Sequence, residues 1–393
     1  MSCPYAGTLP VAASAPLARP LEQVFPPVIA NRYRSIEDPA IVREILRRAE
    51  DFTPANALHA AVDLAPATLR LLARGRFALP PVLASASGPE HLAVRRVVAG
   101  FFSPAKVAAQ AEFIARRTGQ LCRALQPGYR TGAELDLADE LAAVIPPEVM
   151  ARLTGTGLPP LDRLKRWSRD SLELFWGWPD AQRQLELARS AVEYHAWLRG
   201  TVDQALERGD GNLYAALHRA GVETRRIVSL AYFLGIAGQE TTAMLIQGTL
   251  FSALHDGSWS ACARPEGGEA ASAQVVAQVL LQASSVPTWR RIARTNAEVG
   301  GERFAAGEEL VLRLSGGALA EAQDDSLVFG YGLHRCLGAG LARMETEVVL
   351  RAAAAALPDL ELADRHPDWE HLLSFQAPAA VRTRRTASEG NLP

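Results

Sequence analysis

The sequence has little cysteine and almost no net charge. Its four cysteines are spread over 393 residues and form no C-x-x-C pair, which argues against a zinc site or a disulfide framework. The 41 basic and 43 acidic residues nearly cancel, so the formal charge of -2 gives no bulk electrostatic reason to expect nucleic acid or an anionic membrane as a partner. With 48% hydrophobic and 21% charged residues, the composition excludes a disordered or collagen-like chain.

Neither a secretory signal nor a membrane span is evident in the sequence. The N-terminus has no basic segment followed by an apolar one. The most apolar long stretch, residues 227–254, carries Gln239 and Glu240 near its middle, which indicates a buried helix rather than a membrane span. We therefore expect a cytoplasmic monomer.

Apolar residues at three- and four-residue spacing predict a mostly helical chain. Short alternating runs between glycines predict a small antiparallel sheet over residues 289–315 and a hairpin over residues 372–384. We expect one large domain over residues 1–393, with an extended surface arm at 1–20 and a disordered tail at 386–393. The predicted helices cover residues 38–50, 90–98, 104–125, 139–153, 161–176, 180–208, 212–220, 222–254, 273–283 and 341–357.

The loop from Phe329 to Gly338 is the most informative stretch of the sequence. Glycines on both sides of Cys336 let the backbone approach a flat group and point amide N–H groups at the sulfur, which would lower the pKa of the thiol. The dipole of a helix starting near Gly340 would stabilise the thiolate further. A single cysteine held in this way suits one axial metal bond, such as a bond to haem iron. The alternative is a buried structural cysteine in a glycine turn.

This loop resembles that of the cytochrome P450 superfamily, Phe-x-x-Gly-x-x-x-Cys-x-Gly, often with histidine two residues before the cysteine. The matching residues are Phe329, Gly332, His334, Cys336 and Gly338. The resemblance extends over nearly the whole chain, although outside the motifs it depends on the order of elements more than on residue identity.

The resemblance implies a mainly α P450 fold with a minor antiparallel β region. It also implies heme b with Cys336 as the axial ligand of the iron, O2 as co-substrate, and electrons from an external partner of the ferredoxin and ferredoxin reductase type. The residues that it places at the cofactor are His91, Arg95, Ala237, Gly238, Arg291, Phe329, Gly330, His334, Cys336 and Gly338.

A second motif, residues 237–242, lies within the longest apolar helix. A Glu–Thr pair is costly to bury, and the adjacent Gly238 leaves the helix groove open. The motif resembles the acid–alcohol pair of the family, which implies that Glu240 supplies protons and Thr241 passes them on. The alternative is a kinked helix whose threonine bonds its own preceding carbonyl.

A third feature is the spacing of His91 and Arg95, which lie four residues apart and therefore share one face of a helix. Two donors on one face suit the two propionates of haem, and the family places such a pair on the helix that contacts them. By the same resemblance, His334 and Arg291 are further propionate donors. The alternative for each is an ordinary surface charge.

The chain departs from the family's pattern before the sheet. The family's Glu-x-x-Arg should lie within residues 274–285, where Val279 stands at the Glu position and Gln282 at the Arg position. Phe329 follows Gly317 by only 12 positions, so the meander that supplies a third partner to that ion pair is shortened. Deleting one member of a buried ion pair costs roughly 3–5 kcal/mol, whereas replacing every member can be neutral. A coordinated loss is therefore compatible with folding.

The predicted pocket is apolar, which suits a hydrophobic small molecule of natural-product size. We expect a monooxygenase that hydroxylates or otherwise oxidises such a molecule in bacterial secondary metabolism. The alternative is a non-catalytic relative that serves a partner enzyme as a helper, which the missing Glu-x-x-Arg favours. The resemblance also implies which residues form the pocket wall, and each has plain core as its alternative: Phe77, Leu79, Val82, Leu83, Ile236, Ala237, Val286, Trp289 and Phe375.

Overall fold

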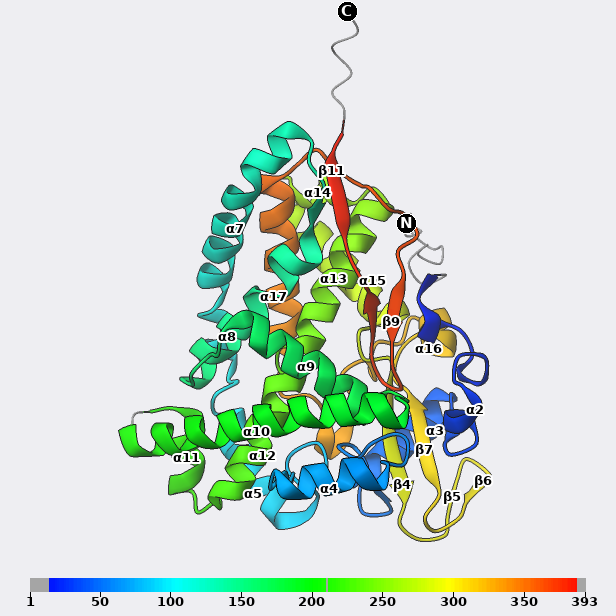
Figure 1. Ribbon diagram of the computed structural model, residues 1–393. Helices are drawn as coiled ribbons and strands as arrows, with labels where there is room; N and C mark the ends of the chain where they lie inside the picture. The colour runs from blue at the N-terminus through cyan, green and yellow to red at the C-terminus, as the bar shows by residue number, and fades with distance from the viewer. Residues whose placement is uncertain (1–13, 210, 387–393) are drawn as a thin grey trace, which may run out of the picture.

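The computed structural model describes residues 14–209 and 211–386. Helices dominate it, as the sequence predicts, and α13 runs through the middle of the molecule (Figure 1). The α-helices are α2 Pro27–Ala30, α3 Pro39–Arg47, α4 Pro66–Arg74, α5 Gly88–Ala99, α6 Pro104–Ala108, α7 Ala111–Thr131, α8 Ile145–Thr154, α9 Leu161–Trp176, α10 Ala181–Arg208, α11 Leu213–Arg219, α12 Thr224–Ala237, α13 Glu240–His255, α14 Trp259–Cys262, α15 Gly268–Ala283, α16 Gly317–Glu321 and α17 Ala339–Ala356. Shorter turns are η1 Pro16–Ala18, η2 Leu21–Gln23, η3 Ala138–Ala142 and η4 Gly332–His334.

The strands form four small sheets. One has the order β1-β7-β4-β2, in which β4 pairs antiparallel with β7 and β1 pairs parallel with it. A two-residue turn joins β5 to β6, and both of its glycines, Gly300 and Gly301, have the positive φ that this type of turn requires. The strands are β1 Arg34–Ile36, β2 Phe52–Thr53, β3 Leu135–Asp136, β4 Thr288–Ala293, β5 Ala297–Val299, β6 Glu302–Phe304, β7 Glu309–Arg313, β8 Leu360–Leu362, β9 Trp369–His371, β10 Gln376–Pro378 and β11 Arg382–Arg385.

Helix α13 is the centre of the core. Every residue from Thr242 to Leu254 is buried, and the helix packs against α15 on one side and α17 on another (Figure 1). The prediction of one continuous helix over residues 222–254 is wrong, because the helix ends at Ala237 and begins again at Glu240. A Gly–Gln sequence is compatible with a helix locally, so the interruption depends on tertiary contacts that a sequence pattern does not show.

Helix α3 shows how local signals place an element beside the cysteine loop. Asp38 accepts hydrogen bonds from the backbone N–H groups of Ala40 and Ile41, and Pro39 occupies the first turn. Its apolar side chains face the core, while its C-terminal end reaches η4. There, a Cβ on Gly332 would lie 3.2 Å from the carbonyl oxygen of Leu46.

The N-terminal segment differs from the surface arm that the sequence predicts. Residues 1–13 lie outside the described residues, but Ala15 and Leu17 are fully buried. Leu17 donates its backbone N–H to Oε1 of Gln376, and its carbonyl accepts from Arg313. These long-range partners hold an Ala- and Pro-rich segment that has no strong local signal. The predicted tail lies outside the described residues from residue 387 onward.

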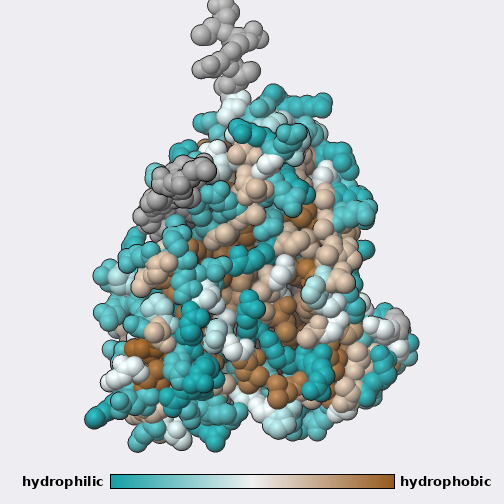
Figure 2. All heavy atoms as spheres, turned by 180° about the vertical axis from the view of Figure 1, so that it is seen from behind, coloured by the Kyte–Doolittle hydropathy of each residue, from teal (hydrophilic) through white to brown (hydrophobic). Residues whose placement is uncertain are grey.

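The surface shows no continuous apolar band on the face seen in Figure 2, where apolar residues occur in separate groups between hydrophilic ones. Among the helices of the described residues, none is both long and apolar enough to span a membrane.

Candidate active site

A large cavity lies between α5, the α12–α13 break, the end of α15, β4 and the cysteine loop. Thr241 lines it, whereas Glu240 does not. All the residues predicted to contact the cofactor line it except His91, which lies behind His334. The predicted residues that line it are Arg95, Ala237, Gly238, Arg291, Phe329, Gly330, His334, Cys336 and Gly338.

The cysteine loop turns sharply so that the Cys336 side chain opens on the cavity. Gly330 and Gly332 adopt φ of 71° and 67°, a left-handed conformation that favours glycine. The backbone N–H of Cys336 donates to the carbonyl of Phe329 at 2.9 Å, which closes the loop. A Cβ on Gly338 would lie 3.8 Å from the Cys336 sulfur. The glycines therefore leave the space beside the sulfur clear.

The predicted low pKa of the Cys336 thiol is wrong for the thiol in this structure. Burial raises its pKa, and this effect exceeds the opposing effects of the Gly338 N–H and of the Arg95 and Arg335 charges. Helix α17 does begin directly after the loop, at Ala339. Cys336 is nevertheless exposed at the cavity surface, so the raised pKa reflects the many protein atoms packed around the sulfur, an effect that the sequence argument omitted.

The cavity is rich in cations that lack anionic partners. Arg95, Arg291 and Arg335 line it, and no carboxylate is among its described lining side chains. Arg291 is 1% exposed, donates from Nη1 to the carbonyl of Arg290 at 2.8 Å, and leaves its Nε without a partner. Burial lowers the pKa of Arg291 to about 10. A buried guanidinium without a carboxylate is costly, so this cavity fits a group that brings its own carboxylates.

Two histidines adjoin these arginines. The His334 ring bonds the carbonyl of Ala86 through Nε2 at 2.7 Å, and its Nδ1 is buried without a partner. Burial, followed by the charge of Arg291, lowers the pKa of His334 to about 3, so the ring is neutral. The His91 ring lies 4.9 Å from the His334 ring, at a steep angle, and both of its nitrogens are buried without a hydrogen bond of good geometry.

A single cysteine sulfur, unpaired guanidinium groups and orphaned imidazole nitrogens together fit haem. The sulfur would bind the iron, and the guanidinium groups would complement two propionates. The glycines of the loop and of the helix break leave room for a flat macrocycle.

The α12–α13 break shapes the opposite wall of the cavity. Gly238 is required there because a Cβ would lie 2.7 Å from the carbonyl oxygen of Leu234 and 2.6 Å from Cε of Met150. Thr241 donates from Oγ1 to the carbonyl of Ala237 at 2.7 Å, which satisfies an acceptor that the broken helix leaves free. The alternative interpretation of this motif, an interrupted helix whose threonine bonds a preceding carbonyl, therefore agrees with the structure. Thr241 also lines the cavity, so the two interpretations are compatible.

Glu240 points away from the cavity and pairs with Lys165 of α9, whose Nζ lies 2.8 Å from Oε1 of Glu240. Both side chains are buried. Gln239 adds a second contact to the same helix, from Nε2 to Oγ of Ser168 at 2.9 Å. The sequence analysis missed Lys165, although a lysine within an apolar helix face of a chain with only two lysines is a usable signal.

A smaller chamber, which we call the aromatic chamber, shares Phe233, Ala237, Thr241 and Trp289 with the larger cavity. Of the predicted pocket residues, Leu79, Ile236, Ala237, Trp289 and Phe375 line it, and Leu83 and Val286 line the larger cavity. Phe77 and Val82 line neither space. The chamber is formed by Leu58, Leu79, Phe175, Trp176, Tyr232, Phe233, Ile236, Ala237, Thr241, Trp289 and Phe375.

Near the end of α15, where the family's Glu-x-x-Arg is missing, the structure has a different ion pair, between Arg313 and Glu37. Val279 is 1% exposed and lies against Gly248 of α13. Arg313 of β7, also 1% exposed, pairs through Nε with Glu37 at 2.7 Å. Its other nitrogens donate to backbone carbonyls, which are those of Leu17, Arg19 and Ser315.

The shortened segment after α16 is fastened from two sides. Arg43 of α3 bonds Asp324 at 2.9 Å and Ser326 at 2.5 Å. Arg343 of α17 bonds Asp325 at 2.9 Å. Two exposed ion pairs therefore hold this segment where the family has a longer meander.

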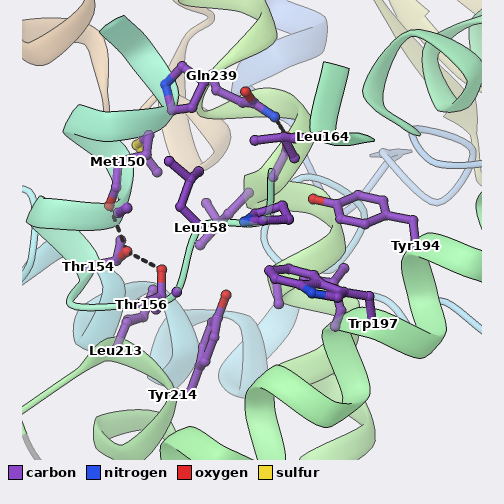
Figure 3. A pocket seen from close by; sticks show the side chains of 18 residues that line it. Met150, Thr154, Thr156, Leu158, Leu164, Tyr194, Trp197, Leu213, Tyr214 and Gln239 are labelled. Atoms are coloured by element: carbon purple, nitrogen blue, oxygen red, sulfur yellow. Dashed lines mark hydrogen bonds between the residues drawn. The ribbon is translucent and has the colours of Figure 1, made fainter. Parts of the chain in front are cut away.

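A second hollow of about 510 Å³ lies on the other side of the helix break, where Met150 and Leu234 separate it from the large cavity. Tyr194 and Trp197 of α10 and Tyr214 of α11 surround it (Figure 3). Two of the hydroxyl groups that line it are hydrogen-bonded to each other, with Oγ1 of Thr154 lying 2.8 Å from Oγ1 of Thr156.

No family model matches this chain. Cytochrome P450-SOY of Streptomyces griseus is 31% identical over 293 residues, covering 70% of this chain and 68% of that protein. Pentalenic acid synthase of Streptomyces avermitilis is 30% identical over 293 residues, covering 70% of each. The structure of cytochrome P450 CREJ in complex with (4-ethylphenyl) dihydrogen phosphate matches with a TM-score of 0.82 at 25% identity, covering 95% of this chain and 98% of that one. The chain belongs to the cytochrome P450 family of haem-dependent monooxygenases that use O2 and external electron donors.

Proposed function

We propose that this chain is a haem-thiolate enzyme that oxidises a hydrophobic small molecule in bacterial secondary metabolism. The observation that carries the proposal is the convergence of the Cys336 sulfur and the unpaired Arg291 guanidinium on one cavity. When bound there, haem supplies the activation of O2 with electrons from a donor outside the chain.

The side chains divide the task of holding the cofactor. Cys336 would bind the iron, and Arg95 and Arg291 would bind the propionates together with His334. Because Nε2 of His334 already donates to the Ala86 carbonyl, the orphaned Nδ1 would donate to a propionate only when the ring is protonated, a form that the negative charge of the propionate would favour. His91 positions His334 through the contact between their rings. Phe329, Gly330 and Gly338 shape the floor.

Thr241 and Glu240 supply the proton path. Thr241 is the member of this pair that borders the cavity. Its hydroxyl donates to the Ala237 carbonyl, and the lone pairs of Oγ1 accept a further hydrogen bond. Glu240 follows the break and is the adjacent carboxylate. Lys165 holds the Glu240 side chain toward α9, so Glu240 must turn from Lys165 to pass a proton to Thr241.

The substrate occupies the aromatic chamber, whose apolar wall favours transfer of a hydrophobic molecule from water. The electron donor is of the ferredoxin type and docks near Arg335 and Arg343, where basic side chains complement an acidic partner. Pentalenic acid synthase supports a role in secondary metabolism.

Haemin titration of the apoprotein tests the proposal. The Arg291→Leu variant should bind haemin at least tenfold more weakly than the wild type, because one propionate loses its partner. The same variant should unfold at an equal or higher denaturant concentration than wild-type apoprotein, since it removes a buried cation that has no carboxylate. A matched control is Arg226→Leu, at an arginine that bonds Glu90 and does not line the cavity. Unchanged haemin affinity in Arg291→Leu would contradict the proposal.

A further inference from the structure

The aromatic chamber is built mainly from rings. Phe175, Trp176, Tyr232, Phe233, Trp289 and Phe375 supply six of its eleven lining residues. We propose that the substrate is a neutral, planar aromatic molecule. This inference rests on the function proposed above and names the substrate class of that site.

The rings meet at steep angles. The ring centroids of Trp176 and Phe375 lie 5.0 Å apart at 86°, and those of Trp289 and Phe375 lie 6.2 Å apart at 88°. Phe175 meets Tyr232 at 83° on the other side. A flat ring placed along one such wall meets the edge of the next, and both arrangements are favourable for aromatic pairs. A saturated molecule of the same shape gains burial but not these contacts.

The hydroxyl groups of the chamber wall are already occupied, whereas Nε1 of Trp176 is buried without a hydrogen-bond partner among the described residues. The Tyr232 hydroxyl lies 2.6 Å from Oγ of Ser171, and Thr241 donates to Ala237. Arg290 lies 5.5 Å from the centre of the Trp176 ring, but its guanidinium is held by the backbone carbonyls of Ala57 and His59. No charged side chain is among the described residues that line the chamber. A charged ligand would therefore lose its hydration without compensation.

The size of the chamber limits the ligand. The open space between the ring walls is small, so only a flat molecule fits there. The boundary shared with the large cavity at Phe233 and Thr241 leaves one edge of such a molecule facing that cavity.

Calorimetric titration of the holoprotein at pH 7 with 2-naphthol and decahydro-2-naphthol tests the inference. The two compounds share one carbon skeleton and one hydroxyl and differ in aromaticity. Each favourable ring pair is worth about two- to twelvefold in affinity, so 2-naphthol should bind about tenfold more tightly. Naphthalene-2-sulfonate, which is charged, should bind at least tenfold more weakly than 2-naphthol. Equal affinity for 2-naphthol and its saturated analogue, or tight binding of the sulfonate, would overturn the proposal.

Variants locate the effect in the chamber. Phe375→Leu and Trp289→Leu keep the wall apolar but remove a ring, so each should reduce the preference for 2-naphthol to less than threefold. Trp197→Leu is the control, because Trp197 lines the second hollow and not the chamber. A preference that survives in both chamber variants would overturn the inference. Haem content, measured from absorbance on the same samples, separates the two proposals: a protein that retains no haem yet prefers 2-naphthol contradicts the proposed function alone.

Discussion

The α12–α13 break and the C-terminal end of α15 both border the cavity of Cys336, yet they follow the family's pattern to very different degrees. The break keeps the glycine, the acid and the alcohol, and it adds a buried ion pair to α9 through Lys165. The end of α15 has lost both charged residues of the family's motif, with Val279 packed in the apolar core. Nearby, Arg313 ties β7 to the N-terminal segment instead.

The difference separates residues that the chemistry of the site needs from residues that only stabilise the fold. A proton path needs an acid and a hydroxyl at fixed places, because only these groups move protons there. Fastening a helix end to a strand needs satisfied donors and acceptors, and different residues meet that need equally well. Arg313, with one carboxylate and three carbonyl partners, is such a substitute.

The largest expected effect concerns the Lys165–Glu240 ion pair, which holds the α12–α13 break against α9. Lys165→Met removes one member of an ion pair whose two side chains are 11% and 6% exposed. The free energy of unfolding should fall by about 4–5 kcal/mol, since Glu240 is left buried without its cation. Urea unfolding followed by circular dichroism measures this. The other lysine provides the control: Lys106→Met, at an exposed side chain 4.6 Å from the Phe101 ring centre, should cost less than about 1 kcal/mol. Equal losses would refute a structural role for the pair.

The next largest effect concerns the Arg313–Glu37 ion pair, which anchors β7 near the end of α15. Arg313→Met should lower the free energy of unfolding by about 3–4 kcal/mol, somewhat less than Lys165→Met because Glu37 is 34% exposed and remains solvated. Arg43→Met removes an exposed ion pair and should cost no more than about 1 kcal/mol. Denaturant unfolding of the two variants decides the matter. If Arg43→Met proves the more damaging, the account of the α15 region is wrong.

The stability of the fold should depend on pH through Glu345 of α17, the helix that packs against both α13 and α15. Burial raises the pKa of Glu345 to about 8, and its Oε1 has no hydrogen-bond partner among the described residues. Since the folded state holds the proton more tightly than the unfolded chain, its contribution is complete below pH 4.5 and is lost as the pH rises to about 8.

Glu345→Gln should remove this dependence. Between pH 5 and pH 7 the wild type should lose about 2–3 kcal/mol more stability than the variant, as two pH units at 1.36 kcal/mol each imply. Urea unfolding at both pH values measures the difference. Parallel pH profiles for the two proteins would show that Glu345 is not protonated in the folded state.

The smallest effect concerns the retained chemistry. Thr241→Ala should reduce the product formed per electron consumed by roughly tenfold, equivalent to ~1.4 kcal/mol, because the hydroxyl at the cavity edge is lost. The neighbouring Thr242, buried and also lining the cavity, supplies the control variant Thr242→Ala. The assay compares electron donor oxidised with product released. Unchanged coupling in Thr241→Ala would remove the role assigned to that hydroxyl.

The sequence predicts those features that local pattern encodes. Helices α9 and α10 match their predicted ranges because caps and apolar spacing agree, as at Asp180, which accepts from the N–H of Arg183. The cysteine loop is recognisable because Gly330 and Gly332 adopt conformations that few other residues tolerate. Local chemistry and tertiary structure agree at these places.

The features that the sequence did not predict depend on contacts between distant residues. Lys165 and Glu240 are 75 positions apart, and Arg313 and Leu17 are 296 positions apart. The ring wall of the chamber brings together Trp176 and Phe375, which lie far apart in the sequence. Periodicity marks such residues only as apolar or charged, and packing alone decides which of them meet.

The central claim is that Cys336 binds haem although the family's Glu-x-x-Arg is absent. Its most direct test is the difference spectrum of the reduced protein under carbon monoxide, with Cys336→Ser as the matched variant. The account predicts a strongly red-shifted Soret band in the wild type and its loss in Cys336→Ser. A wild-type protein that stays colourless after haemin is supplied, or a variant that keeps the band, would contradict it.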